Sequence, residues 1–182
     1  EEKALIFAGS SALTALTTSG VFPHFGVGVD PNPEQEHRLL AGHAFALPFL
    51  YRPRMSHSAL KLVSGDLVFV PGANIPFAKW VEEELGIHSP EMDEGHNVVN
   101  LSAQIAQKMG CNPIIFVGLD LSYTDTKSYT SSLPLHPLWL GRSNPHVFSQ
   151  DTVLRLDLFG HPTHTKWEWL SEASWLAKLP KI

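Results

Sequence analysis

The sequence is poor in the features that mark several common classes of protein. It holds a single cysteine, Cys111, which excludes an internal disulfide framework and is typical of a reducing compartment. Its 13 basic residues are outnumbered by 18 acidic ones and form no Lys- or Arg-rich run, so no nucleic-acid partner is expected. No apolar run approaches the roughly 20 residues of a membrane-spanning helix. We therefore expect a cytoplasmic globular protein without a membrane span.

Metal-binding motifs are also absent, although the chain holds ten histidines. There is no H-E-x-x-H and no Cys/His pattern with zinc spacing, so no metal centre is assigned. We expect most of the histidines to be structural or solvated. Because an unperturbed histidine titrates near neutral pH, one of them could still act as a general base. His161, in the loop-rich part of the chain, is our candidate for that role.

Strand-like apolar runs alternate with helix-like segments over the first two thirds of the chain. Strands are predicted at 4–8, 25–29, 44–51, 67–70 and 113–118, and helices at 12–19, 34–41, 56–63, 77–85 and 98–109. This alternation predicts an α/β fold, a Rossmann-like three-layer α/β/α sandwich with a mainly parallel sheet. The run 113–118 is unbroken and apolar, so we expect it to be an inner strand buried on both faces.

Beyond residue 128 the pattern weakens, and Pro, Ser, Asn, Trp and His become frequent. We expect residues 128–165 to form a loop-rich, lid-like excursion with one strand at 153–158. A terminal helix is predicted at 165–179. We interpret residues 1–182 as a single domain. Because the chain begins with Glu1 and enters a strand-like run almost at once, we expect it to be an excised or trimmed part of a longer protein.

Candidate ligand-binding residues follow the first two predicted strands. Gly9, Ser10 and Ser11 separate the first strand from a helix, where backbone N–H groups and the helix dipole can bind a phosphate. A plain tight turn would explain them as well. Asp30 ends the second strand and precedes a Pro-Asn-Pro breaker. Its carboxylate could bind a ribose hydroxyl or a divalent ion, or it could simply start the turn.

A second candidate anion site precedes the helix predicted at 98–109. It consists of Gly95, His96 and Asn97, whose N–H groups lie at the start of that helix. Asn97 also suits the N-cap position, and that structural role alone would explain it.

The densest polar cluster follows the strand predicted at 113–118. Its members are Asp120, Tyr123, Thr124, Asp125, Lys127 and Tyr129. Parallel sheets bind their ligands beyond the carboxyl ends of their strands, so we expect this cluster to contact a ligand. For Asp120 the alternative is a capping role, in which its carboxylate accepts hydrogen bonds from backbone N–H groups of the loop.

The same segment resembles a pattern, GxDLxYTDxKxY, of the family that contains the Maf flagellin glycosyltransferases and the archaeal 6-hydroxymethylpterin diphosphokinases, called MptE-like. The matching residues here are Gly118, Asp120, Leu121, Tyr123, Thr124, Asp125, Lys127 and Tyr129. Upstream, Asp30 matches an aspartate of the family, and His24 stands where another aspartate is usual. The resemblance implies a Rossmann-like domain that binds a nucleotide or a nucleotide-sugar.

Three functions follow from this resemblance and stay open. The first is a glycosyltransferase that uses a nucleotide-activated sugar of the nonulosonic or sialic acid type, with Asp120, Asp125 and His161 as catalytic residues. The second is an ATP-dependent diphosphokinase, in which Asp30 and Asp120 would hold Mg²⁺. The third is a non-catalytic domain that binds a ligand or a partner. Apart from Mg²⁺ in the second case, no cofactor is expected.

Overall fold

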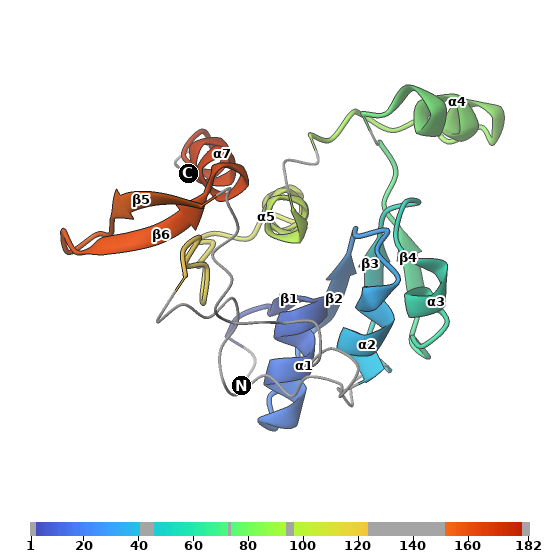
Figure 1. Cartoon of the computed structure of the whole chain (residues 1–182). Coiled ribbons are helices and arrows are strands. Elements are labelled where there is room, and N and C mark those ends of the chain that lie inside the picture. The colour runs from blue at the N-terminus through green and yellow to red at the C-terminus, as the bar shows by residue number, and fades with distance from the viewer. Residues whose placement is uncertain (1–2, 41–45, 73, 94–96, 124–151, 180–182) are drawn as a thin grey trace.

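The structure is a computed structural model that describes residues 3–40, 46–72, 74–93, 97–123 and 152–179. Its main sheet has four parallel strands in the order β1-β2-β3-β4 (Figure 1). The strands are β1 (Phe7–Gly9), β2 (Phe25–Gly28), β3 (Phe49–Tyr51) and β4 (Leu67–Phe69). The predicted parallel α/β architecture is therefore confirmed, with strands that are shorter than the apolar runs around them.

Helices cover both faces of this sheet and give the predicted three layers. The first layer holds α1 (Ser10–Thr18), α2 (Glu34–Leu40) and α3 (His57–Leu60), and the opposite layer holds α5 (Val98–Lys108). The core on the first side contains Ala8, Leu13, Leu39, Phe49, Met55 and Ala59. The core on the α5 side contains Val27, Val29, Leu50, Val70, Met92, Leu101 and Ile105.

Strand periodicity explains how these side chains divide between the two cores. Successive residues of a strand point to opposite faces, so Phe49 and Leu50 enter different cores. Gly26 pairs with Phe49 in the sheet, and a Cβ on Gly26 would lie only 2.4 Å from Phe49 Cδ2. Because Gly26 has no side chain, it leaves the space that the ring of Phe49 fills.

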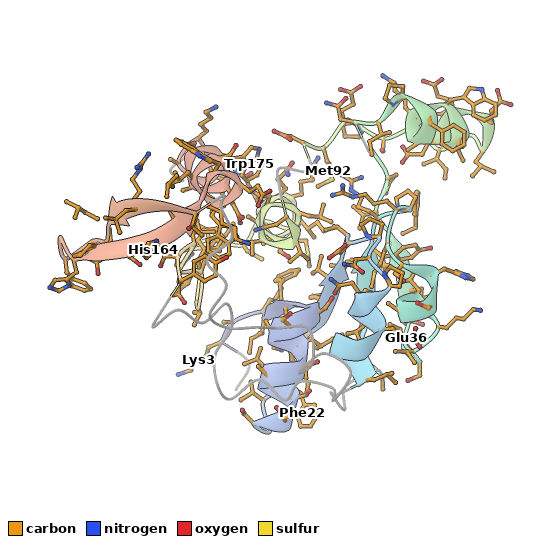
Figure 2. All side chains as sticks on the ribbon, in the orientation of Figure 1. Lys3, Phe22, Glu36, Met92, His164 and Trp175 are labelled. Atoms are coloured by element: carbon orange, nitrogen blue, oxygen red, sulfur yellow. The ribbon has the colours of Figure 1, made fainter. Side chains whose placement is uncertain are left out.

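One helix stands away from the sheet. In Figure 1, α4 (Pro76–Glu84) lies at the end of an excursion that leaves after β4 and returns before α5. We call residues 74–91 the α4 arm. Its ends meet at the body of the domain, because the Met92 N–H donates to the Gly72 carbonyl at 2.9 Å. Figure 2 shows Met92 where the arm returns to the domain.

The C-terminal part contains a two-stranded hairpin, and the sequence predicts only the first of its strands. Strand β5 (Thr152–Leu156) falls near the expected 153–158 and pairs antiparallel with β6 (Pro162–Lys166). The helix expected at 165–179 is α7 (Trp167–Leu176), and it begins later because β6 occupies its predicted start. The polar run of β6 hides its strand character, which comes from Thr163 and Thr165 opposite β5. Of the lid-like excursion, residues 124–151 lie outside the described residues.

The prediction that residues 113–118 form an inner strand is wrong. They adopt no strand conformation, and Ile115 and Val117 are 77% and 90% exposed. An apolar run shows that a segment can form a strand, but not that a neighbouring strand is available to pair with it. Here the chain turns away at Gly118 and Leu121, which have φ of 69° and 51°, and continues toward β6. Within the described ranges, no helix is long and apolar enough to cross a membrane.

Candidate functional site

The N-termini of two helices meet at the carboxyl end of β1. Gly9 ends β1 and is also the N-cap of α1. It packs against the start of α5 so closely that a Cβ on Gly9 would lie 2.7 Å from Val98 Cγ1. The predicted segments at residues 9–11 and at Asn97 are therefore neighbours in space, although almost ninety residues separate them in the sequence.

The N-terminus of α1 is suited to an anion. Its N-cap is a glycine, so no side chain bonds to the first N–H groups, and its first turn contains no acidic residue. Those N–H groups need an acceptor, and the helix dipole gives this end a partial positive charge. Ser10 and Ser11 are half-buried and add two hydroxyl groups at the same place. A phosphate group matches such a site in both charge and hydrogen bonding.

The N-terminus of α5 is capped by its own chain. The Asn97 Oδ1 accepts from the Val99 and Asn100 N–H groups at 2.7 and 3.4 Å. In return, the Asn100 Oδ1 accepts from the Asn97 N–H at 3.1 Å, which completes a capping box. The predicted N-cap role of Asn97 is thereby confirmed. Gly95 and His96, predicted in the same anion site, lie outside the described residues.

Asp30 lies at the same edge of the sheet, just beyond β2. Its Oδ1 accepts from the Asn32 N–H at 2.9 Å, and its Oδ2 accepts from the buried Gln35 Nε2 at 2.5 Å. Its carbonyl accepts from the Ser56 N–H at 3.0 Å. The carbonyl bond joins Asp30 to the N-cap residue of α3. The two carboxylate bonds belong to the turn that leads into α2, which was one of the two interpretations of Asp30 from the sequence. They also fix the direction of the carboxylate.

Arg52 is a residue of this edge that the sequence analysis missed. It follows β3 as Asp30 follows β2, and its side chain is fully buried. Its guanidinium donates to the carbonyls of Val70, Pro71 and Met92 at 3.0, 2.6 and 3.4 Å. These bonds join the end of β4 to the end of the α4 arm. An arginine directly after a buried strand was the signal that could have revealed it.

The segment that carries Asp120 lies against the hairpin. The Tyr123 N–H donates to the His164 carbonyl at 2.8 Å, and Thr165 Oγ1 donates to the Leu121 carbonyl at 2.5 Å. Asp120 itself is exposed and makes no hydrogen bond or ion pair within the described residues. The expectation that Asp120 follows a buried strand is therefore wrong, because the preceding segment is not a strand.

Aromatic rings and a lysine pack beside this segment. The ring of Tyr123 lies 4.8 Å from the ring of Trp169, measured between centroids. Lys166 Nζ lies 5.6 and 5.4 Å from these two ring centroids, within the range of a cation–π contact. The other predicted members of the cluster, Thr124, Asp125, Lys127 and Tyr129, lie outside the described residues.

His161, the candidate base, lies in the turn of the β5–β6 hairpin. Figure 1 shows this turn at the end of the hairpin that points away from the main sheet. Asp157 organises the turn, since its Oδ1 accepts from the Phe159 and His161 N–H groups, both at 2.8 Å. The bond from the His161 N–H is the main reason that the pKa of Asp157 is lowered from its ordinary 3.8. The structure does not bring His161 to the ends of β1 and β2.

The Mg²⁺ set implied by the diphosphokinase alternative is not complete in the described residues. Both carboxylate oxygens of Asp30 already accept hydrogen bonds from Asn32 and Gln35. Among the residues that the structure describes, no three His, Cys, Asp or Glu side chains are grouped as a metal site would need. Asp30 and Asp120 do not by themselves form the oxygen-rich shell that Mg²⁺ requires.

Comparison with protein families identifies the chain. A family model described as 6-hydroxymethylpterin diphosphokinase MptE-like matches residues 1–126. The chain belongs to this family. The match covers the sheet, α1 to α5 and the segment up to Tyr123, so this MptE-like domain contains the paired helix N-termini within the matched region. The resemblance noted in the sequence is confirmed.

A solved structure has the same fold. The Maf glycosyltransferase from Magnetospirillum magneticum AMB-1 is similar with a TM-score of 0.67 and 15% identity, over 98% of this chain and 26% of that chain. At this identity the likeness concerns the fold alone, and the chain spans about a quarter of that protein's length. A comparison with curated protein sequences gave no significant match. The family assignment therefore rests on the sequence match, and the structural likeness supports the fold.

Proposed function

We propose that this MptE-like domain binds the nucleotide of an activated donor and takes part in group transfer. The observation that supports the proposal is the pair of helix N-termini at the carboxyl end of β1. There, the uncapped N-terminus of α1 and the hydroxyl groups of Ser10 and Ser11 would bind a donor phosphate. Asp30, beyond the neighbouring strand β2, is directed by its turn and would accept a hydrogen bond from a ribose hydroxyl.

The preferred donor in this proposal is a nucleotide-activated sugar of the nonulosonic or sialic acid type. Asp120 is exposed and negatively charged, so it can accept hydrogen bonds from sugar hydroxyls. Thr124, Asp125 and Lys127 would assist it, as the family pattern implies. His161 could deprotonate only an acceptor that reaches the hairpin turn. We place this chemistry in the cytoplasm, as part of a longer protein.

The description of the family favours a second candidate, an MptE-like transfer of pyrophosphate from ATP to a pterin alcohol. That reaction needs Mg²⁺ to neutralise the charge on the transferred phosphates. The first candidate would bind the donor phosphate at the N-terminus of α1 without a metal ion. Metal dependence therefore separates the two candidates.

A thermal-shift series tests the proposal with CMP, with CMP-activated sialic acid and with ATP, each with and without Mg²⁺. Stabilisation by the cytidine compounds without metal supports the glycosyltransferase. Stabilisation by ATP only with Mg²⁺ supports the diphosphokinase. If no nucleotide at millimolar concentration raises the Tm, the nucleotide-binding proposal is wrong and a non-catalytic domain becomes the better interpretation.

Substitution at the first turn of α1 locates the phosphate. Ser11→Asp places a negative charge at the helix N-terminus, which stabilises a helix by about 0.3–1 kcal/mol but repels a phosphate. We expect Ser11→Asp to keep or raise the Tm while it lowers nucleotide affinity at least tenfold. Ser11→Asn, the matched neutral control, should change affinity much less. Equal affinity in Ser11→Asp and wild type would place the nucleotide elsewhere.

A further inference from the structure

The α4 arm contains a cavity that the proposed nucleotide site does not use. Its volume is about 370 Å³, and its walls come from α4 and from the chain that returns toward Met92. Sites for small molecules typically have volumes of about 300–1,000 Å³. The residues that matter for its chemistry are Glu82, Glu83, Ser89 and the backbone of Gly72.

Glu82 is a buried carboxylate in the wall of this cavity. It is 6% exposed, and its Oε2 accepts from the Gly72 N–H at 2.9 Å. Its other oxygen, Oε1, is buried and has no hydrogen-bond partner among the described residues. Buried carboxylate oxygens are nearly always paired, because removing them from water without a donor is costly. The second oxygen of Glu82 is therefore a candidate acceptor for a donor group of a bound molecule.

Ser89 has a second unpartnered oxygen in the same wall. Its Oγ is buried without a partner among the described residues, and it lies 3.1 Å from the position that a Cβ on Gly72 would occupy. Gly72 also binds Glu82, so the two unpartnered oxygens flank one glycine. Glu82 and Ser89 therefore both line the cavity and both lie against Gly72.

The charge of the cavity indicates the sign of its ligand. Lys79 and Glu91 form an ion pair at 2.8 Å between Nζ and Oε1, so their charges offset each other. Glu82 and Glu83 remain as negative groups in the lining. Within the part of the chain that the structure describes, no metal-binding cluster is present here or elsewhere. An organic cation fits this charge better than a metal ion does.

We propose that the cavity binds a small organic cation through a primary ammonium group. An ammonium has three N–H donors and no acceptor. It would donate to Glu82 Oε1 and to Ser89 Oγ, and Glu83 would supply a further negative charge. This site is separate from the helix N-termini at β1, and the proposal does not depend on the proposed function.

The test uses ¹⁵N-labelled protein and two probes of equal length, 1,4-diaminobutane and 1,4-butanediol. The amide of Gly72 is the reporter, because its N–H donates to Glu82. We expect the diamine to move the Gly72 cross-peak in a saturable way at millimolar concentration, and the diol to leave it in place. Glu82→Gln should lower the affinity for the diamine at least tenfold. Glu84→Gln, an exposed position outside the cavity on the same helix, should bind like wild type.

Three results would overturn the proposal. They are an equal shift with the diol, no shift with the diamine up to tens of millimolar, or unchanged binding in Glu82→Gln. The glutamine keeps an acceptor for the Gly72 N–H, so the arm should still fold. If the arm does not fold in Glu82→Gln, Ser89→Ala is tested instead, because that substitution removes only one contact to the ligand. Severalfold weaker binding in Ser89→Ala supports the proposal, and wild-type binding contradicts it.

Discussion

Replacing Gly9 with alanine should separate the two helix N-termini that meet at β1. The backbone of Gly9 has φ −72° and ψ 167°, a conformation that alanine adopts without strain. The added methyl group would therefore act only through its contact with Val98 Cγ1, at 2.7 Å. Because valine is stiff about χ1, the contact is relieved only by a disfavoured rotamer or by movement of α5.

Two opposing terms set the size of the effect on stability. Overpacking by one methyl group typically costs about 1–3 kcal/mol. Replacing glycine with alanine at a compatible conformation raises the free energy of unfolding by about 0.4–1 kcal/mol, because alanine restricts the unfolded chain. We therefore expect Gly9→Ala to lower the free energy of unfolding by about 0.5–2 kcal/mol. At about 2–4 °C per kcal/mol for a domain of this size, the Tm should fall by a few degrees.

A double-mutant cycle in urea tests this reasoning. Val98→Ala removes the atom that the new methyl group meets, so the double mutant should be less destabilised than the sum of the single mutants by about 1 kcal/mol. Val99→Ala, one residue further along α5, serves as the control and should be additive with Gly9→Ala. Additivity with Val98→Ala as well would refute the steric argument. Nucleotide affinity measured on the same variants should fall with Gly9→Ala and partly recover in the double mutant.

Substitutions at Asn97, Asp120 and Asp157 test three other features of the structure. Asn97→Ala should lower the free energy of unfolding by about 0.5–2 kcal/mol in a urea melt, because it removes the N-cap of α5, and Asn97→Ser should restore most of it. Asp120→Asn should change stability by less than about 0.5 kcal/mol, since the side chain is exposed; titration should show weaker donor binding, and unchanged affinity would remove Asp120 from the site. The lowered pKa of Asp157 means that its ionised form stabilises the hairpin above the ordinary pKa and that this contribution is lost as the pH falls through the folded value. The Tm of wild type should therefore drop more than that of Asp157→Asn between pH 5 and pH 3, and parallel curves would contradict the linkage.

The parallel sheet and its helices could be predicted because their signals are local. The run that contains Val27 is short and apolar, and the spacing of Leu101 and Ile105 is that of an amphipathic helix, so each element appears at the expected place. Asn97 was identified as an N-cap for the same reason, since capping depends on the residues that follow directly.

The failures concern partners that lie far away in the sequence. The segment with Ile115 and Val117 has the composition of a buried strand, yet its side chains are exposed and no described strand pairs with it. The predicted placement of Asp120 depended on that strand, so it was wrong for the same reason. The contact between Gly9 and Val98 could not be predicted either, because no local pattern records which helix packs against a given glycine.

The closed base of the α4 arm has a consequence for how this domain can vary. Because Gly72 and Met92 are joined by a hydrogen bond of 2.9 Å, the chain enters and leaves the arm at nearly the same point. Arg52 secures both sides of that point through the carbonyls of Pro71 and Met92. We therefore expect that the arm can be shortened, lengthened or exchanged for another module while the sheet keeps its register. This position is a natural insertion point, at which relatives could acquire new recognition elements without rebuilding the parallel sheet.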